Sequence, residues 1–290
     1  MTVVPFEDEE IRYRLSKLRE LPPLPTSLKR LIEIIHSEVD IPGELESIIS
    51  YDPSLSAKIL ATANSAFYGY RKQVKTLSNA INVIGTAQAK SISIYTLLLG
   101  VFSNGAMIRE AHREMLWKHA FACSRIAVEV NRRRSWIKAE EAALLGLLHD
   151  IGWIVMAAHF KEQFTAIFEK AQKDNIPPWC VEIRYGLDHG KLGSYLACRW
   201  ALPEELRAVM EFHHAPQRGT SFSTEVSMVY LINMLSHSRE YPELLVEKST
   251  VGQCRKLYIS DEEWGRYQEV TEGIWPEVEQ LWNSLCKGPK

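Results

Sequence analysis

Six residues of metal-ligand type are candidates for chemistry in this 290-residue chain: His119, His149, Asp150, His189, His213 and His214. His149 and Asp150 are adjacent and follow a leucine-rich run. Neutral imidazoles together with a carboxylate are typical ligands of iron, manganese or zinc. An open position on such a metal would let a bound water act as a nucleophile at neutral pH. The set therefore predicts a divalent metal site, although each histidine taken alone is better explained as a hydrogen-bonded core residue.

Helical patterns must position these residues. Apolar residues at helical spacing predict a helix over 114–132, with His119 on its inner stripe. A second, central helix is predicted over 140–149, so that the His149–Asp150 pair stands at its end. A buried helix end would hold such a pair dry and rigid.

Downstream of that pair, Gly152 is expected to close the central helix, and one uninterrupted helix is expected over 154–173. A helix over 191–200 follows His189, and another begins near Pro203 with His213 on its apolar stripe. No alternating strand pattern longer than four residues is present. The sequence therefore predicts an all-α, multi-helix bundle.

Helix signals also mark the N-terminal half. Asp52 followed by Pro53 predicts a helix start, because an aspartate can cap the first turn and proline fits there. Thr26 or Ser27 is expected to cap an earlier helix, and Gly85 is expected to end a later one. We expect an N-terminal helical bundle beside the bundle that carries the histidines.

Composition and charge exclude several classes. Apolar residues make up 46% of the chain and charged residues 24%, and the formal net charge of −2 gives no basic footprint for nucleic acid. A helix–turn–helix-like run at 44–63 offers only Lys58 as a cation in its second helix, which argues against direct DNA binding.

The cysteines and the apolar runs bear on location. The five cysteines are scattered without a CxxC pair, which favours a reducing cytoplasm over a disulfide scaffold. The acidic residues 1–10 lack the apolar core of a signal peptide, and the apolar run 92–102 is about half the length of a membrane span. We expect a cytoplasmic protein that binds neither membrane nor nucleic acid.

Longer motifs carry a family resemblance. The histidines around the Leu-His-Asp-Ile-Gly run at 148–152 resemble the HD superfamily of metal-dependent phosphohydrolases, and those downstream resemble its HD-GYP cyclic-di-GMP phosphodiesterase branch. Four motifs in the N-terminal half resemble the HDOD family, the HD-related output domains of bacterial signalling proteins. They are Leu-Pro-Pro-Leu-Pro at 21–25, Ser-Tyr-Asp-Pro-Ser-Leu at 50–55, Asn-Ser-Ala-Phe-Tyr-Gly at 64–69 and Ala-Ile-Asn-Val-Ile-Gly at 80–85.

The resemblance implies a domain plan and a role. The plan is an N-terminal helix or extension at 1–20, an HDOD domain at 21–218 and a C-terminal helical extension at 219–290. The domain would comprise an N-terminal helical subdomain at 21–105 packed against an HD-like subdomain at 106–218. Members of this family are regarded as regulatory modules of bacterial signal transduction. The resemblance therefore implies partners among other signalling proteins, which the sequence does not name, and the oligomeric state stays open.

The sequence departs from the catalytic pattern at three places. Phosphodiesterase relatives carry a phosphate-binding lysine where this chain has Trp153, and tryptophan cannot replace that charge. No Gly-Tyr-Pro signature follows the pair His213–His214. The position that matches the closing aspartate of the HD set is Asn233, whose neutral amide is a poorer ligand for a divalent cation.

Three hypotheses follow from this pattern. The leading one is a regulatory module that acts through protein–protein contact and retains a metal site. The alternative is a metal-dependent phosphodiesterase or phosphohydrolase acting on a nucleotide or cyclic dinucleotide, with the six residues as ligands and with His149 and Asp150 as the catalytic candidates. The third is a helical scaffold without a metal. A solvent-reachable cavity and a cation beside the metal would favour the enzyme.

Overall fold

A computed structural model of the chain describes residues 13, 21–37, 43–65, 67–69, 73–102, 109–219, 221–241, 257 and 259–287. Regular structure among these residues is helical throughout, so the predicted all-α class is confirmed. The N-terminal extension at 1–20, apart from Tyr13, lies outside the described residues.

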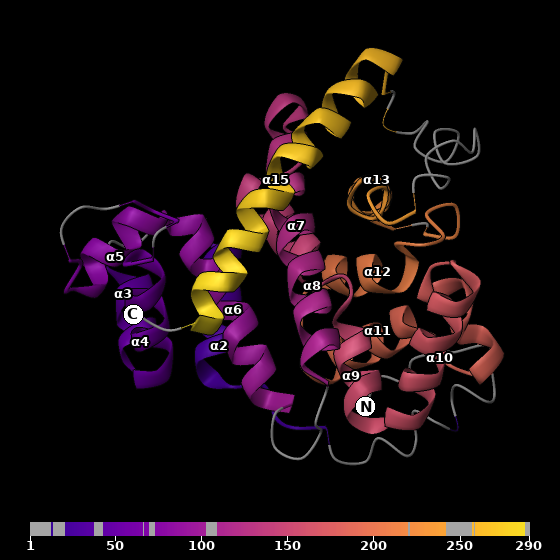
Figure 1. Ribbon diagram of the computed structural model, residues 1–290, viewed down its shortest axis with the longest axis horizontal. Helices are drawn as coiled ribbons and strands as arrows, with labels where there is room; N and C mark the ends of the chain where they lie inside the picture. Colours follow the sequence, from indigo (N-terminus) through magenta and orange to yellow (C-terminus); the bar gives the residue numbers. More distant parts are fainter. Residues whose placement is uncertain are drawn as a thin grey trace. The chain divides into compact units, whose positions relative to one another are not determined.

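The helices are shown in Figure 1. Their bounds in chain order are α2 (Thr26–His36), α3 (Glu44–Ser50), α4 (Pro53–Ala63), α5 (Leu77–Ile84), α6 (Thr86–Phe102), α7 (Glu110–Arg134), α8 (Ala139–Leu148), α9 (Ile151–His159), α10 (Lys161–Asp174), the short 3₁₀ turns η1 (Pro178–Cys180) and η2 (Glu182–Tyr185), α11 (His189–Arg199), α12 (Glu204–Phe212), α13 (Ser223–His237) and α15 (Asp261–Lys287).

The helices fall into two compact units. The long-helix unit comprises residues 24–101, 114–147 and 265–290, and the histidine unit comprises residues 1–23, 102–113 and 148–264. Five of the six metal-ligand candidates belong to the histidine unit, whereas His119 belongs to the long-helix unit. The domain boundaries drawn from the sequence stay a prediction.

Local signals account for the first helices of the long-helix unit. The Asp52 carboxylate accepts hydrogen bonds from the backbone N–H groups of Ser54 and Leu55 at 2.9 and 3.1 Å, and Pro53 opens α4, as predicted. Gly85 ends α5 with a φ of 88°, which glycine adopts without strain.

Helix α2 begins differently from the expectation. Neither Thr26 nor Ser27 caps it, because both already lie inside the helix and Pro25 occupies the cap position without a side-chain bond. The φ of Pro25 is fixed near −59° by its ring, and its extended ψ of 139° makes it the last residue before the helix. The proline therefore sets the helix start one residue earlier than a hydroxyl cap would.

The C-terminal helix packs along α7 (Figure 1). Trp117 stacks on Phe121 with ring centroids 4.1 Å apart, and Trp282 of α15 lies 5.1 Å from Trp117. An ion pair of 3.0 Å joins Arg125 to Glu277. The aromatic residues near the C-terminus therefore serve core packing within the long-helix unit.

In the histidine unit, α11 packs against α9 and α12, α10 against α9, and α13 against α12. The prediction of a single helix over 154–173 is wrong, because the helix is interrupted at Phe160, between α9 and α10. The Phe160 N–H donates to the Met156 carbonyl and closes α9, while its own carbonyl accepts from the Phe164 N–H and opens α10. No glycine or proline marks this break.

Gly152 does not close a helix, contrary to the expectation. The central helix α8 ends at Leu148, a turn carries His149 and Asp150, and α9 begins at Ile151. A Cβ atom on Gly152 would stand 1.7 Å from the backbone oxygen of His189. The glycine therefore permits the close backbone contact between α9 and α11.

One stretch, residues 139–159, is long and apolar enough to cross a membrane, and 83% of its apolar 18-residue window is buried inside the protein. It is divided by the polar His149–Asp150 turn into α8 and α9. A core helix of a folded protein passes the same test, so this stretch is weak evidence for a membrane span.

The contact at Gly152 yields a stability prediction. Gly152→Ala is expected to lower the free energy of unfolding by about 3 kcal/mol or more, since the added methyl meets rigid backbone. Gly273→Ala on α15 is the control, because its Cβ meets nothing within 4 Å. That variant should be about 0.5–1 kcal/mol more stable than the wild type. Urea unfolding measures both, and equal effects would contradict the close contact.

Candidate metal centre

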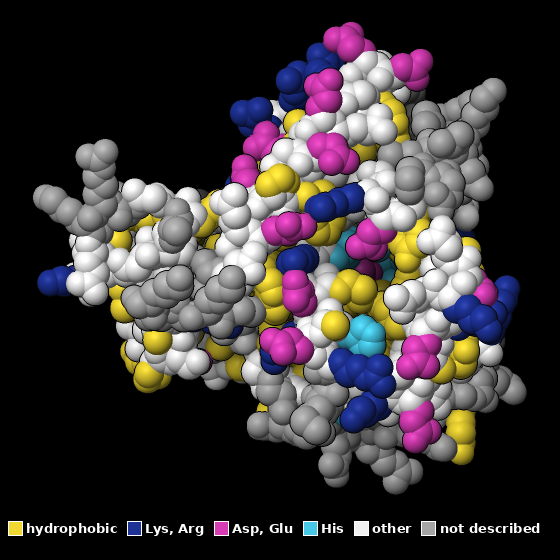
Figure 2. Space-filling model, in the orientation of Figure 1, with side chains coloured by type: hydrophobic (Ala, Val, Ile, Leu, Met, Phe, Trp, Pro, Cys, Tyr) yellow, Lys and Arg dark blue, Asp and Glu magenta, His cyan; other side chains and the backbone are white. Residues whose placement is uncertain are grey.

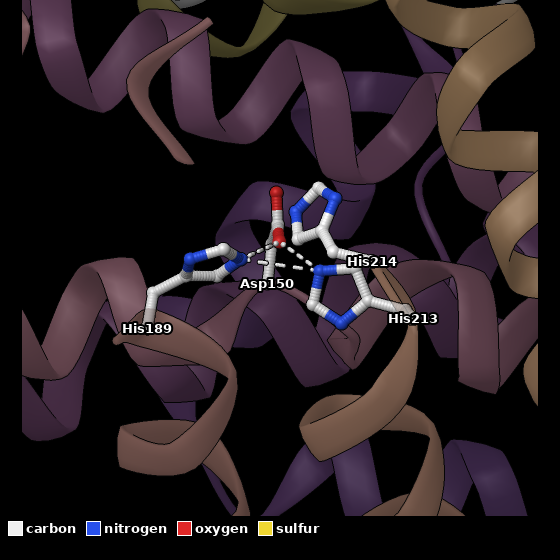
Figure 3. A group of neighbouring side chains, drawn as sticks. All are labelled: Asp150, His189, His213 and His214. Carbon is white, nitrogen blue, oxygen red and sulfur yellow. Dashed lines mark hydrogen bonds and ion pairs between the residues drawn. The ribbon is translucent and has the colours of Figure 1, made fainter. Parts of the chain in front are cut away.

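Three helix ends bring the candidate ligands together (Figure 3). Asp150 stands in the turn before α9, His189 is the first residue of α11, and His213 and His214 follow the last turn of α12. The Asp188 side chain caps α11 by accepting from the Lys191 N–H at 2.9 Å, which fixes where that helix starts. The four side chains offer ligand atoms that all lie within 4.8 Å of one another.

Three of these atoms form a tight triangle. Nε2 of His189 lies 3.1 Å from Oδ1 of Asp150, and Nε2 of His213 lies 3.2 Å from the same oxygen. The two Nε2 atoms are 3.1 Å apart. Figure 3 shows both imidazoles pointing at the carboxylate. Both histidines are almost completely buried.

The opposite nitrogen of each imidazole is already engaged. Nδ1 of His213 lies 2.8 Å from the Met210 carbonyl oxygen, which can only accept, so this nitrogen carries the hydrogen. Nδ1 of His189 lies 2.8 and 2.9 Å from the two carboxylate oxygens of Glu182. Hydrogen bonds of this kind orient metal-binding histidines and leave Nε2 free to bind the ion. The facing lone pairs need a proton or a metal ion between them.

Charge and burial govern the protonation of this group. Burial would lower the pKa of His189, but Glu182 and Asp150 outweigh it through charge and hydrogen bonding and raise that pKa to about 10. Burial also raises the pKa of Glu182, and the nearby His189 opposes that rise. Without a metal, the His189 imidazolium therefore supplies the positive charge that the triangle needs.

His214 completes the group in a different state. Burial, reinforced by the neighbouring His213, lowers its pKa well below 6.5, so its imidazole is neutral at pH 7. Its Nε2 is buried and has no hydrogen-bond partner among the described residues. A buried neutral imidazole nitrogen of this kind is suited to ligate a metal or to meet a bound molecule.

His149 lies on the other side of the Asp150 carboxylate. It is fully buried, and its Nε2 is 3.5 Å from Oδ2 of Asp150, whereas Oδ1 faces His189 and His213. Its ring contacts that of His213 with centroids 4.9 Å apart. Asp150 therefore presents one oxygen to each side.

The structure places the remaining candidates as follows. His119 lies in α7 of the long-helix unit, buried, with its Nε2 3.5 Å from Sγ of Cys123, and its membership of the centre stays a prediction. Asn233 lies in α13 and is fully buried, with neither side-chain amide atom hydrogen-bonded to a described residue. Its match to the closing position of the HD set also stays a prediction.

Trp153 packs inward instead of lining an open site. It is 3% exposed, and its indole stacks on the His189 ring with centroids 4.3 Å apart and an angle of 11°. The Phe168 ring packs edge-on against the same indole, with ring centroids 5.1 Å apart. The residue that stands in place of the phosphate-binding lysine therefore holds His189 in its orientation.

Sequence reasoning missed Glu182 and this role of Trp153. Glu182 precedes His189 by one short 3₁₀ turn, and no periodicity or motif marks it as a partner of a histidine. The backbone N–H of His189 also donates to Glu182 at 2.8 Å, so one carboxylate fixes both the ring and the helix start.

A cavity of about 190 Å³ adjoins the cluster inside the histidine unit. Its walls include His213, His214, Trp179, Lys191 and Arg218. The cluster therefore borders a space that a small molecule can enter.

Comparisons with known proteins agree with this architecture. A curated protein from Treponema pallidum (strain Nichols), itself uncharacterised, is 25% identical over 221 residues, which are 75% of this chain and 42% of that protein. The chain thus spans less than half the length of this relative.

Two crystal structures share the fold. One is an HDOD domain protein of unknown function from Geobacter sulfurreducens, with a TM-score of 0.75, 20% identity and coverage of 96% of this chain and 97% of that one.

The other is described as a candidate signal transduction protein from Marinobacter aquaeolei VT8, with a TM-score of 0.79, 18% identity and coverage of 96% of this chain and 65% of that one. A family model for the HDOD domain matches residues 21–216, which are more than half of the chain. With the helical fold and the buried His-Asp cluster, this match shows that the chain belongs to the HDOD domain family.

Proposed function

We propose that this protein is a regulatory signalling module that binds one divalent metal ion through Asp150, His189 and His213, with His214 as a further ligand. The convergence of two Nε2 atoms and one carboxylate oxygen within 3.1–3.2 Å carries the proposal. The residues fit a metal, because the Nδ1 atoms are held by Glu182 and Met210 and each Nε2 faces the shared centre. Imidazole and carboxylate ligands suit iron, manganese or zinc.

The regulatory part of the proposal has two supports. The HDOD family match covers residues 21–216, and a structure of the same fold is described as a candidate signal transduction protein. Trp153 is buried against His189, where catalytic relatives would carry a cation for phosphate. We expect partners among other signalling proteins of a bacterial cytoplasm, and a metal that stabilises the histidine unit.

Elemental analysis tests the metal. Protein purified without a metal-affinity column is expected to contain close to one equivalent of iron, manganese or zinc. His213→Gln should lose it, because the triangle then lacks one nitrogen. His159→Gln is the control, since this exposed histidine at the end of α9 is outside the cluster. At a metal concentration about 100 times Kd, binding should stabilise the wild type by about 2.7 kcal/mol.

Metal content that is equally low in the wild type and both variants, with no rise in Tm on addition of Mn²⁺ or Zn²⁺, would refute the metal site. Equal content in all three proteins would place the metal elsewhere.

Proton release provides a second, independent prediction. The pKa of His189 is raised to about 10, so metal binding at pH 8 must displace a proton from its Nε2. Calorimetry in two buffers of different protonation enthalpy should give about one proton released per metal. In Glu182→Gln the pKa of His189 falls, and fewer protons should be released. Release that is zero in the wild type, or unchanged in the variant, would contradict this protonation state.

The same pKa sets the pH dependence of stability. Folded His189 binds its proton more tightly than the unfolded chain does, so its stabilisation is fully present below pH 6.5. It is lost as the pH rises from 6.5 to about 10. Metal-free protein should therefore unfold at lower urea concentration at pH 9.5 than at pH 6.5, and the loss should be smaller in His189→Gln relative to its own value at pH 6.5.

A specific observation favours a second candidate function, a metal-dependent phosphohydrolase. The cluster borders a cavity of about 190 Å³ whose walls include Lys191 and Arg218. A cavity and a cation beside the metal are what such an enzyme requires. In that case His149 and Asp150 are the candidate catalytic residues.

Hydrolysis assays separate the two functions. Metal-loaded protein, offered bis(p-nitrophenyl) phosphate and cyclic dinucleotides, is expected to show no turnover above that of His213→Gln. Turnover that is present in the wild type and in His159→Gln but absent from His213→Gln would replace the regulatory proposal with the enzymatic one.

A further inference from the structure

The cavity beside the cluster carries an inference of its own. It lies within the histidine unit, between η1, the start of α11 and the loop after α12. Lys191 and Arg218 supply its cations, Trp179 and Phe212 its apolar wall, and His214 an imidazole. This composition is polar and partly charged, so the space suits a polar ligand.

The cations in the wall are available, whereas the acids are engaged. Neither Lys191 Nζ nor the Arg218 guanidinium forms an ion pair or hydrogen bond with another described residue. Three carboxylates also line the cavity, but each has a partner. Glu182 accepts from His189, Asp188 caps α11, and Glu211 accepts from the Ser194 hydroxyl at 2.9 Å. Asp188 and Glu211 keep their charges, but the charged hydrogen-bond donors of the wall that lack a partner are those of Lys191 and Arg218, which favours a ligand with acceptor oxygens such as an oxyanion.

A buried imidazole adds a second polar group. Nε2 of His214 is buried without a hydrogen-bond partner among the described residues, and the side chain lines this cavity. Leaving such a nitrogen unpaired costs free energy unless a bound group satisfies it. In the tautomer with the hydrogen on Nε2, His214 can donate to an oxyanion that meets Lys191 and Arg218, and its Nδ1 is then the nitrogen left for a metal.

Size restricts the ligand. Pockets for drug-sized ligands measure roughly 300–1,000 Å³, and an engineered cavity of about 150 Å³ holds one benzene. A cavity of about 190 Å³ therefore fits a single small oxyanion with a few attached atoms and is too small to enclose a cyclic dinucleotide. The Trp179 ring is also already in contact with His214 at 4.6 Å and His237 at 4.5 Å, which argues against stacking of a nucleobase.

We propose that this cavity binds a small phosphate-type oxyanion through Lys191, Arg218 and His214, and that this anion acts as an effector of the metal centre. The effector role rests on the proposed metal, because His213, His214 and Glu182 belong both to the cavity wall and to the cluster or its hydrogen-bond partners. A divalent cation beside the cavity strengthens the attraction of an anion. By linkage, the anion must then raise the affinity for the metal by the same factor.

Calorimetric titration with inorganic phosphate tests the site in the full chain. The protein is studied both after EDTA treatment and after loading with Mn²⁺ followed by dialysis, with chloride at equal ionic strength as the blank. Lys191→Gln and Arg218→Gln should each weaken phosphate binding about tenfold, the loss expected for one charged hydrogen bond. Lys161→Gln and Arg184→Gln, which remove the same charges outside the cavity, should leave it unchanged.

The outcomes separate the anion site from the metal. Phosphate binding that is absent, or equally weak in all four variants, overturns the anion site. Tighter phosphate binding in the Mn²⁺-loaded protein supports the effector role, and equal binding in both forms overturns it. If no metal binds but phosphate binding still depends on Lys191 and Arg218, the proposed metal function fails while the anion site stands.

A second titration tests which phosphate compounds the cavity accepts. Glycerol phosphate and AMP are compared with inorganic phosphate on the wild type. Comparable affinity for phosphate and glycerol phosphate, with weaker binding of AMP, supports the size limit set by the cavity. Tighter binding of AMP that is lost in Lys191→Gln would overturn that limit.

Discussion

The backbone contact between α9 and α11 is the constraint on which the histidine unit depends. It requires that residue 152 have no Cβ, because the His189 carbonyl oxygen occupies that place. The residue just before α9 is Asp150 and the first residue of α11 is His189, so the contact of the two helices also sets the distance between carboxylate and imidazole. Packing and site geometry therefore have the same cause.

Hydrogen bonds then convert proximity into a directed site. The Met210 carbonyl and the Glu182 carboxylate fix which nitrogen of each imidazole faces inward. Trp153 stacks on one face of the His189 ring. These supporting residues are different from those that would bind a substrate. The histidines can therefore keep the arrangement of metal ligands although Trp153 stands where phosphodiesterase relatives carry a lysine.

The sequence predicted the helical class, the helix start at Asp52 and the residue types of the cluster, because all of these depend on local patterns or on a motif. It missed the break at Phe160, which backbone hydrogen bonds create without glycine or proline. It misread Gly152, because a glycine needed for contact with a distant helix looks the same as one that ends a helix. Glu182 was missed for a related reason, since its partnership with His189 is a matter of tertiary geometry. His119 lies in the other compact unit, and its membership of the centre stays a prediction.

The positions of the proposed ligands along the chain have a consequence for folding. Asp150, His189 and His213 come from the ends of three different helices, and further helices, α10 among them, lie between them along the chain. Bringing such distant residues together in an unfolded chain costs loop-closure entropy before any ligand pair can form. If the proposed metal binds here, we therefore expect it to be acquired after α9, α11 and α12 have assembled, rather than to nucleate the fold as it does in a short zinc-binding module. Metal uptake would then report that the histidine unit has completed folding.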